Sequence, residues 1–438
     1  MIGVIRAVMG WGVAKGPRNE LLGRNIVAKA RFHRAVVVDM CSESRRIGSG
    51  PRPESAERLA WRICKGLFSA TPLSADGSVA VVVAMFDCKE RMHEARGALH
   101  AARYRGLSLE AAAAARAKGK VVVGGAAFAT DMVPYTAEEV AGFGVRTAVV
   151  WNRLWSGVGK DRAWELLYDG MVCAHHRHGE VGRRFVMWLR GEPYEWPYVA
   201  EEERDDLAKV LCANTHGEGD QRVCEAARLL LKGGVVDSVL IKTIDTDMIV
   251  QVLMTPDWGG EAGEPAGGLC LQLKNELVDM AGVCRDLGKS SNERMTAGFW
   301  CLACGGVDYC KGLTRFGFTT RVLLGLVAAG TDTVVDVDGL TGTLTVSVRA
   351  VMDSLCGAKR RQVKGETVGG FVAELNSIAF CVALFAGASS RREPCGGPVM
   401  PDLDIFGDIS RTLPFDDAFL RRVQAGRVPV HPFVHVDR

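Results

Sequence analysis

Short, continuous apolar runs recur along the chain, and three of them are followed at once by an acidic residue. The run AVVV at residues 35–38 leads into Asp39, and VAVVVAMF at residues 79–86 leads into Asp87. The third run, SVLIKTI at residues 238–244, leads into Asp245. Runs of about four to eight apolar and β-branched residues are typical of buried strands. The pattern therefore predicts an α/β fold with a mostly parallel central sheet flanked by helices.

The third run is followed by two acids, Asp245 and Asp247, one residue apart. In a parallel sheet, ligands bind in the crevice outside the carboxyl ends of the strands, so acids placed there suit a metal ion or a substrate. A solvated, Asp-rich turn that closes a strand is the alternative. Because other predicted strands also end in an acid, a metal or substrate site is favoured over such a turn.

A helical pattern precedes the third run. Its apolar positions are Val223, Ala226, Ala227, Leu230 and Leu231. This spacing predicts an amphipathic helix that begins near Gly219. Glu218 and Asp220 flank its start, where the helix dipole favours acids even without a ligand.

Further elements follow from weaker patterns. VRTAVVW at residues 145–151 predicts another strand, and the Gly- and Ala-rich residues 121–136 predict a connection. A hydrophobic run at residues 298–307 is followed by Asp308 and by a turn with Gly312 and Gly317. The part of the chain after this turn begins with a helical pattern.

Residues 89–120 carry an excess of positive charge within a helical pattern. The basic residues are Lys89, Arg91, Arg96, Arg103, Arg105, Arg116, Lys118 and Lys120, against the acids Glu90, Glu94 and Glu110. A solvated helical face is the usual meaning of such a run. Its place directly after Asp87 makes binding of phosphate groups the sharper alternative.

Composition restricts the class of protein. The chain has 438 residues and a formal net charge of only +3, so any nucleic-acid binding must rest on local positive charge. We expect an intracellular protein, in the nucleus, the cytoplasm or an organelle, because no secretory signal or membrane-spanning run is recognisable. The 14 cysteines are accordingly expected to be mostly reduced thiols.

Two groups of residues have partial zinc-site character. His175, His176 and His178 are clustered, but no cysteine or carboxylate stands at a suitable spacing. Cys284, Cys301, Cys304 and Cys310 form the second group, in which the spacing of a second CxxC pair is missing. A zinc site at the cysteines stays open as an alternative.

The acids at strand and helix ends define the candidate chemistry. They are Asp39, Asp87, Glu218, Asp220, Asp245, Asp247 and Asp308. Carboxylates gathered at one edge of a sheet would repel one another unless they bound cations. Carboxylate ligands suit Mg²⁺ or Mn²⁺, and two such ions about 3.5–4 Å apart can clamp an in-line phosphoryl displacement. Phosphodiester hydrolysis is the chemistry that this set predicts.

The order of these motifs resembles the flap endonuclease/XPG superfamily of 5′ nucleases, and in part the 5′–3′ exoribonucleases. Gly3 and the two residues after it resemble the N-terminal segment of the family, VVVDM its first strand, and MFDCK its Phe-Asp-Gly-Lys motif. GEGDQ resembles its paired acids, TIDTDM its Asp-x-Asp pair, and GGVDYCKGLTRFG its Gly-x-Asp and glycine-turn region. The likeness covers residues 1–330, and residues 331–438 form a C-terminal extension.

The resemblance implies a PIN/5′-nuclease-like core with a helical arch and a helix-rich C-terminal part. It implies that the seven acids hold two Mg²⁺ or Mn²⁺ ions, with Lys89 beside the scissile phosphate. Residues 89–135 would form the arch, and residues 155–205 an insertion. Substrate contacts are implied for Gly3, Arg91, Arg96, Arg103, Arg105, Gly312 and Gly317.

Departures from the family pattern shape the functional expectation. Cys88 replaces the usual glycine, and no C-terminal sliding-clamp motif is recognisable, which favours a divergent member such as one from a large DNA virus or an organelle. The first hypothesis is a structure-specific nuclease that acts on DNA with a 5′ flap or junction. The same chemistry on RNA is the second, and a catalytically inactive binding protein or scaffold is the third.

Overall fold

The computed structural model describes the chain in pieces. These are residues 34–48, 50–68, 80–87, 108–123, 126–156, 159–178, 183–188, 194–196, 219–255, 258–260, 268–273, 276–287 and 290–307, with shorter pieces at 26–27, 211, 265, 312–313, 334–337, 344–346, 378, 381–382 and 385. The chain divides into two compact units. We call residues 31–230 with 234–244 the parallel unit, and residues 1–30, 231–233 and 245–438 the antiparallel unit.

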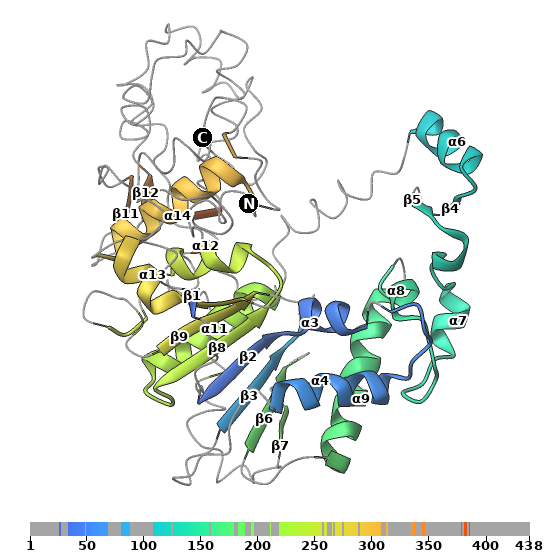
Figure 1. Cartoon of the computed structure of the whole chain (residues 1–438), viewed down its shortest axis with the longest axis horizontal. Helices are drawn as coiled ribbons and strands as arrows, with labels where there is room; N and C mark the ends of the chain where they lie inside the picture. Colours follow the sequence, from blue (N-terminus) through green and yellow to red (C-terminus); the bar gives the residue numbers. More distant parts are fainter. Residues whose placement is uncertain are drawn as a thin grey trace, which may run out of the picture. The chain divides into compact units, whose positions relative to one another are not determined.

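The parallel unit is built on five strands in the order β8-β2-β3-β6-β7 (Figure 1). They are β2 (Ala35–Asp39), β3 (Ala80–Met85), β6 (Arg183–Trp188), β7 (Tyr194–Trp196) and β8 (Ser238–Thr243). The strands β8, β2, β3 and β6 are parallel, and β7 runs antiparallel to β6. Val37 of β2 pairs with Val83 on one side and Ile241 on the other. The prediction of a mostly parallel sheet flanked by helices is confirmed.

The connections of this sheet reverse direction beside β2. From β2 the chain proceeds outward to β3 and then β6, and it later returns to add β8 on the opposite side of β2. A reversal of this kind in a parallel sheet opens a crevice at the carboxyl ends of the two strands that flank it. Here those ends carry Asp39 on β2 and Thr243 on β8.

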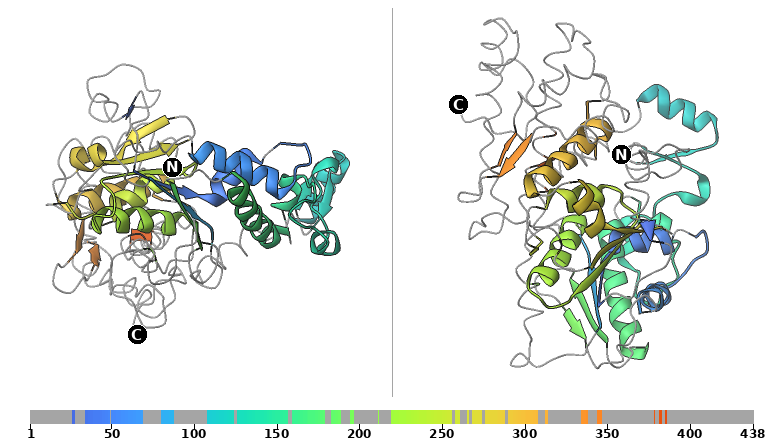
Figure 2. Two further views of the ribbon diagram at one scale, coloured as in Figure 1. Left: turned by 90° about the horizontal axis from the view of Figure 1, so that it is seen from below. Right: turned by 60° about the vertical axis from the view of Figure 1, so that its left-hand side comes forward.

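Helices cover the parallel sheet. They include α3 (Met40–Ile47), α4 (Ala56–Phe68), α9 (Lys160–His178) and α11 (Gly219–Lys232). The helices α4 and α9 pack against each other, as both views show (Figures 1 and 2). Residues 35–38 of β2 and 82–86 at the end of β3 are fully buried, as expected for strands enclosed by helices.

One predicted strand is wrong, and other elements occur where the sequence showed no clear pattern. Residues 145–151 form no regular strand: Val149 makes an isolated bridge to Glu54, and Trp151 starts the short helix α8 (Trp151–Leu154). Their apolar character comes from burial of Val149 and Trp151 rather than from sheet pairing. Residues 155–205, expected as an insertion, contribute α9, β6 and β7.

The end of the basic stretch and the residues that follow it form short elements. The helix α6 (Leu109–Ala117) is capped by Ser108 and precedes a hairpin of β4 (Val121–Val123) and β5 (Ala126–Phe128). The 3₁₀ helix η2 (Thr130–Met132) and α7 (Ala137–Ala141) follow, the latter with a capping box. Residues 121–136 were expected to be only a connection, whereas α6 lies within residues 89–120, for which a helical pattern was predicted. Residues 88–107, which include the first part of the predicted arch, lie outside the described part.

The antiparallel unit contains β1 (Ile26–Val27), β9 (Gly268–Leu273) and β10 (Glu276–Asp279), with β10 between the other two. Its helices are α12 (Asp247–Met254), α13 (Met280–Leu287) and α14 (Ser291–Gly305). A second hairpin joins β11 (Val335–Val337) and β12 (Leu344–Val346). Since residues beyond 330 are described only in short pieces, the division at that residue stays a prediction.

Gly170 on α9 lies against the start of α4. A Cβ atom at this position would come within 2.7 Å of the Ala56 carbonyl oxygen and 2.8 Å of its carbon. These are backbone atoms, which cannot rotate away, so Gly170→Ala should lower the free energy of unfolding by about 1–3 kcal/mol in urea denaturation. Gly66→Ala on α4, where no described atom lies within 4 Å, should instead raise it by about 0.5–1 kcal/mol. Equal effects of the two substitutions would contradict this packing.

Among the described residues, no helix combines the length and apolar character that crossing a bilayer requires.

Candidate functional site

Asp39 is a buried carboxylate at the carboxyl end of β2, only 3% exposed. It also caps α3: its Oδ1 accepts a hydrogen bond from the Ser42 amide at 3.2 Å. Its Oδ2 accepts a hydrogen bond from the Thr243 hydroxyl at the end of β8, at 3.0 Å. A carboxylate has about four acceptor positions, so both oxygens keep capacity for a further ligand.

The pKa of Asp39 is raised to about 6: burial is the largest cause and the nearby Asp87 carboxylate also raises it, while hydrogen bonds from Ser42 and Thr243 act in the opposite direction. A charged group buried without a cation is electrostatically unfavourable, and a bound cation would relieve this cost. Capping of α3 does not by itself require a negative charge at residue 39, because an uncharged Asn caps a helix equally well.

Asp87 follows β3, the strand next to β2, and is half-buried. Its Oδ1 accepts a hydrogen bond from the Gly219 amide at 2.9 Å, where α11 begins. The helix dipole favours a carboxylate at this end. A Cβ on Gly219 would lie 2.7 Å from Asp87 Oδ1 and 3.7 Å from Asp39 Oδ1, so the two carboxylates face the same small region beside Gly219.

Four other residues act on this pair or on its neighbours. Burial and the charges of Asp87 and Asp39 raise the pKa of the Cys41 thiol, while the Lys160 ammonium at the start of α9 lowers it. Thr243 Oγ1 lies 3.4 Å from Ser42 Oγ, so the hydroxyl of β8 sits between Asp39 and the first turn of α3. Sequence reasoning missed Cys41, Ser42, Lys160 and Thr243. Of these four, only Ser42 had a local signal in the sequence, because an N-cap Asp accepts a hydrogen bond from the amide three residues later.

The structure thus brings Asp39 and Asp87 together beside the start of α11, as predicted. Asp220 lies in the first turn of α11 and is half-buried; its Oδ1 accepts a hydrogen bond from the Gln221 amide at 3.0 Å. Glu218, which was predicted beside it, lies outside the described residues.

Asp245 and Asp247 belong to the antiparallel unit. The Asp245 Oδ1 accepts a hydrogen bond from the Asp247 amide at 2.9 Å, where α12 begins. This is the local turn that was considered as the alternative to a ligand site, and both acids are half-buried. Their convergence with Asp39 and Asp87 stays a prediction.

Gly312 is the one predicted substrate-contact residue that is described. Its φ of +72° favours glycine, and a Cβ there would lie within 2.7 Å of the Leu302 carbonyl oxygen. Its close approach to the end of α14 is therefore a packing requirement, independent of any ligand. The other predicted site residues, Asp308, Lys89, Gly3, Arg91, Arg96, Arg103, Arg105 and Gly317, lie outside the described part of the chain.

Within the described residues, no three or more His, Cys, Asp or Glu side chains gather as a group that could hold a metal ion. Because Glu218 and Asp308 lie outside these residues, the assembly of the seven acids stays a prediction. The cysteines Cys284, Cys301 and Cys304 are buried free thiols. Cys310 and the side chains of the histidine cluster are outside the described residues. The pair Asp39 and Asp87 fits part of a divalent-cation site through its hard oxygen donors, its burial and the raised pKa of Asp39.

Comparison of the chain with known protein families and with curated proteins finds no match.

Proposed function

We propose that this protein is a divalent-metal-dependent nuclease with a PIN/5′-nuclease-like core, which hydrolyses phosphodiester bonds of DNA and leaves 5′-phosphate ends. The observation that carries the proposal is the pair Asp39 and Asp87 at the ends of adjacent parallel strands, beside the point where the sheet reverses direction. This is the position at which open α/β sheets bind ligands. A buried carboxylate with a raised pKa beside another carboxylate is typical of functional sites.

In this proposal, Asp39 and Asp87 would hold one Mg²⁺ or Mn²⁺ ion. Glu218, Asp220, Asp245, Asp247 and Asp308 would complete the set for two ions. When bound, the ions would polarise the phosphate and make water a better nucleophile.

The chain's own residues orient the two carboxylates. Thr243 and the Ser42 amide each donate to one oxygen of Asp39, and the Gly219 amide donates to Asp87 Oδ1. These bonds fix both side chains before a substrate arrives, and such preorganisation is worth a large share of catalysis.

Nucleic-acid binding is proposed for the basic stretch that begins at Lys89. Of its basic residues, Arg116, Lys118 and Lys120 are described, and all three are exposed at the end of α6. Cations there also favour the helix dipole, so their place agrees with a solvated face as well. Exposed lysine and arginine are the side chains that neutralise phosphates.

The test is cleavage of four substrates by the purified protein with Mn²⁺ at one salt concentration. The substrates are a 5′-flap duplex, a nicked duplex, single-stranded DNA and single-stranded RNA. We expect cleavage of the flap or nicked DNA with 5′-phosphate products, and loss of cleavage in EDTA that Mn²⁺ restores. Preference for RNA would favour the second hypothesis. Absence of cleavage of all four, or cleavage that persists in EDTA, would contradict the proposal.

A further inference from the structure

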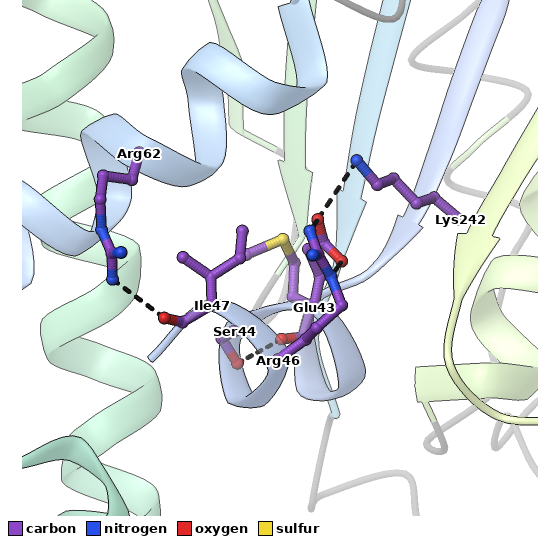
Figure 3. A network of polar contacts seen from close by, with 7 residues as sticks. Glu43, Ser44, Arg46, Ile47, Arg62 and Lys242 are labelled. Carbon is purple, nitrogen blue, oxygen red and sulfur yellow. Dashed lines mark hydrogen bonds and ion pairs between the residues drawn. The ribbon is translucent and has the colours of Figure 1, made fainter. Parts of the chain in front are cut away.

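A buried ion pair joins α3 to β8 one helical turn beyond Asp39 (Figure 3). Glu43 of α3 has a side chain only 2% exposed, and its Oε1 lies 3.2 Å from the Nζ of Lys242, whose side chain is 11% exposed. Arg46 donates to both oxygens of Glu43, at 2.8 and 2.6 Å. Burial acts to raise the pKa of Glu43, but the hydrogen bonds and charges of Arg46 and Lys242 outweigh it, and the pKa is lowered. Glu43 is therefore a charged group in the folded protein.

The two ends of this pair lie next to the groups that hold Asp39. Lys242 is the residue before Thr243, whose hydroxyl donates to Asp39. Glu43 is the residue after Ser42, whose amide donates to the other oxygen of Asp39. Two successive residues of β8 thus contact α3. Thr243 bonds to Asp39, the N-cap of the helix, and Lys242 pairs with Glu43 in its first turn.

Asp39 is at once the last residue of β2 and the N-cap of α3. Any movement of the first turn of α3 relative to β8 would therefore change the hydrogen bonds of the Asp39 carboxylate. Asp39 and Asp87 repel each other when both are charged, so the carboxylate needs a restraint to keep its orientation.

A buried ion pair is a costly way to add stability, because uncharged side chains of similar size often stabilise a fold as well or better. Arg46 already satisfies both oxygens of Glu43, so Lys242 is not needed to pair that carboxylate. What Lys242 adds is a link between α3 and a different element, the strand that carries Thr243.

We propose that Glu43 and Lys242 form a positioning pair, which holds the first turn of α3 against the end of β8 and so fixes the Asp39 carboxylate for phosphodiester cleavage. This inference rests on the proposed nuclease function. The pair acts through Asp39, Ser42 and Thr243 and has no contact of its own with substrate in the proposal.

The double variant Glu43→Gln/Lys242→Met separates positioning from stability. It removes both charges of the pair and keeps the side chains at similar size, and Arg46, whose side chain is 43% exposed, can turn to solvent when it loses its carboxylate. The urea midpoint should therefore stay close to that of the wild type. The single-turnover cleavage rate at saturating substrate should fall at least about tenfold, with the substrate Kd unchanged, because only the orientation of Asp39 changes. If the pair only stabilised the fold, a double variant as stable as the wild type should also cleave at the wild-type rate. Lys242→Arg, which can keep the ion pair, should retain the wild-type rate.

Arg62→Gln is the matched control. Arg62 of α4 donates to the Ile47 carbonyl at the other end of α3, at 2.9 Å (Figure 3). It also pairs with Glu54 at 2.7 Å. This substitution removes an ion pair and, with it, the hydrogen bond that anchors α3 at the end remote from Asp39. We expect the cleavage rate to remain that of the wild type.

Hydrogen exchange provides a readout that does not depend on activity. In the double variant, amides of residues 40–47 should exchange faster than in the wild type, while those of residues 81–85 in β3 should be unchanged. A stable double variant with wild-type rate and wild-type exchange would overturn the positioning role. Lys242→Met alone, which leaves Glu43 with Arg46, gives the same test if the double variant does not fold. Absence of cleavage by the wild type would contradict the nuclease function instead, and the exchange measurement would still decide whether the pair holds α3.

Discussion

Asp39→Asn should abolish phosphodiester cleavage and at the same time make the folded protein more stable at neutral pH. Asparagine keeps the helix cap, since Asn and Asp are about equally good N-cap residues, and its side chain can still bond with Ser42 and Thr243. The negative charge that would bind the cation is lost. We expect the cleavage rate to fall about a thousandfold or more, which corresponds to about 4 kcal/mol of lost transition-state stabilisation.

The gain in stability follows from the raised pKa of Asp39. Burial first, and then Asp87, raise this pKa from 3.8 to about 6 in the folded protein. Between these two values the folded state retains a proton that the unfolded state has released, so the free energy of unfolding falls as the pH rises through this window. The full difference is about 3 kcal/mol for a shift of this size. Asp39→Asn removes this loss, so its advantage over the wild type should be absent near pH 4 and fully present above pH 7.

Urea denaturation of the wild type and of Asp39→Asn from pH 4 to pH 8 measures the difference between their free energies of unfolding. This difference reports residue 39, because the other titratable groups are the same in both proteins. Added Mn²⁺ should stabilise the wild type and not the variant, because a ligand that binds only the folded state raises its stability. Asp87→Asn in parallel should reduce the pH dependence of the wild type only in part, since burial is the larger cause of the shift. A variant that cleaves at the wild-type rate would show that Asp39 is not in the active site. A stability difference that does not change with pH would contradict the raised pKa.

The central strands could be predicted from the sequence because burial on both faces leaves a continuous apolar run. β2, β3 and β8 all have this character, and they are neighbours in the sheet. β6 was missed although residues 185–188 of its sequence RRFVMW form an apolar run, because two arginines precede that run and no acid follows it directly. The false strand at residues 145–151 shows the converse: apolar side chains of a loop and a short helix can be buried without any sheet pairing.

The candidate site was predictable only as far as neighbouring strands determine it. Asp39 and Asp87 follow adjacent parallel strands, so their proximity follows from strand pairing alone. The partners of Asp39 depend on which strand joins β2 on its other side and in which register. Thr243 therefore became recognisable only with β8 in place. Asp245 and Asp247 were predicted from spacing, but the same spacing also forms the local turn at the start of α12, and sequence cannot separate these two uses.

Gly219→Ala should disable the site through a single methyl group. The added Cβ would lie 2.7 Å from Asp87 Oδ1, closer than the two atoms can approach, and 3.7 Å from Asp39 Oδ1. The Asp87 carboxylate would have to rotate away and would lose the hydrogen bond from the Gly219 amide. Misplacement of a catalytic group by about 1 Å can cost about a hundredfold in rate, so we expect cleavage to fall by at least about that factor.

The effect on the fold should be small by comparison. Asp87 is half-buried and can turn toward solvent, so the lost hydrogen bond should lower the free energy of unfolding by about 1 kcal/mol. Gly142→Ala at the end of α7 is the matched control, because its Cβ would meet the nearest described atom, the Glu139 carbonyl oxygen, at an ordinary 3.5 Å. That variant should cleave at the wild-type rate. If Gly219→Ala also cleaved at the wild-type rate, the active site could not lie at Asp39 and Asp87. If it lost activity only together with a large loss of stability, the methyl group would be acting on the packing of α11 and not on the carboxylate.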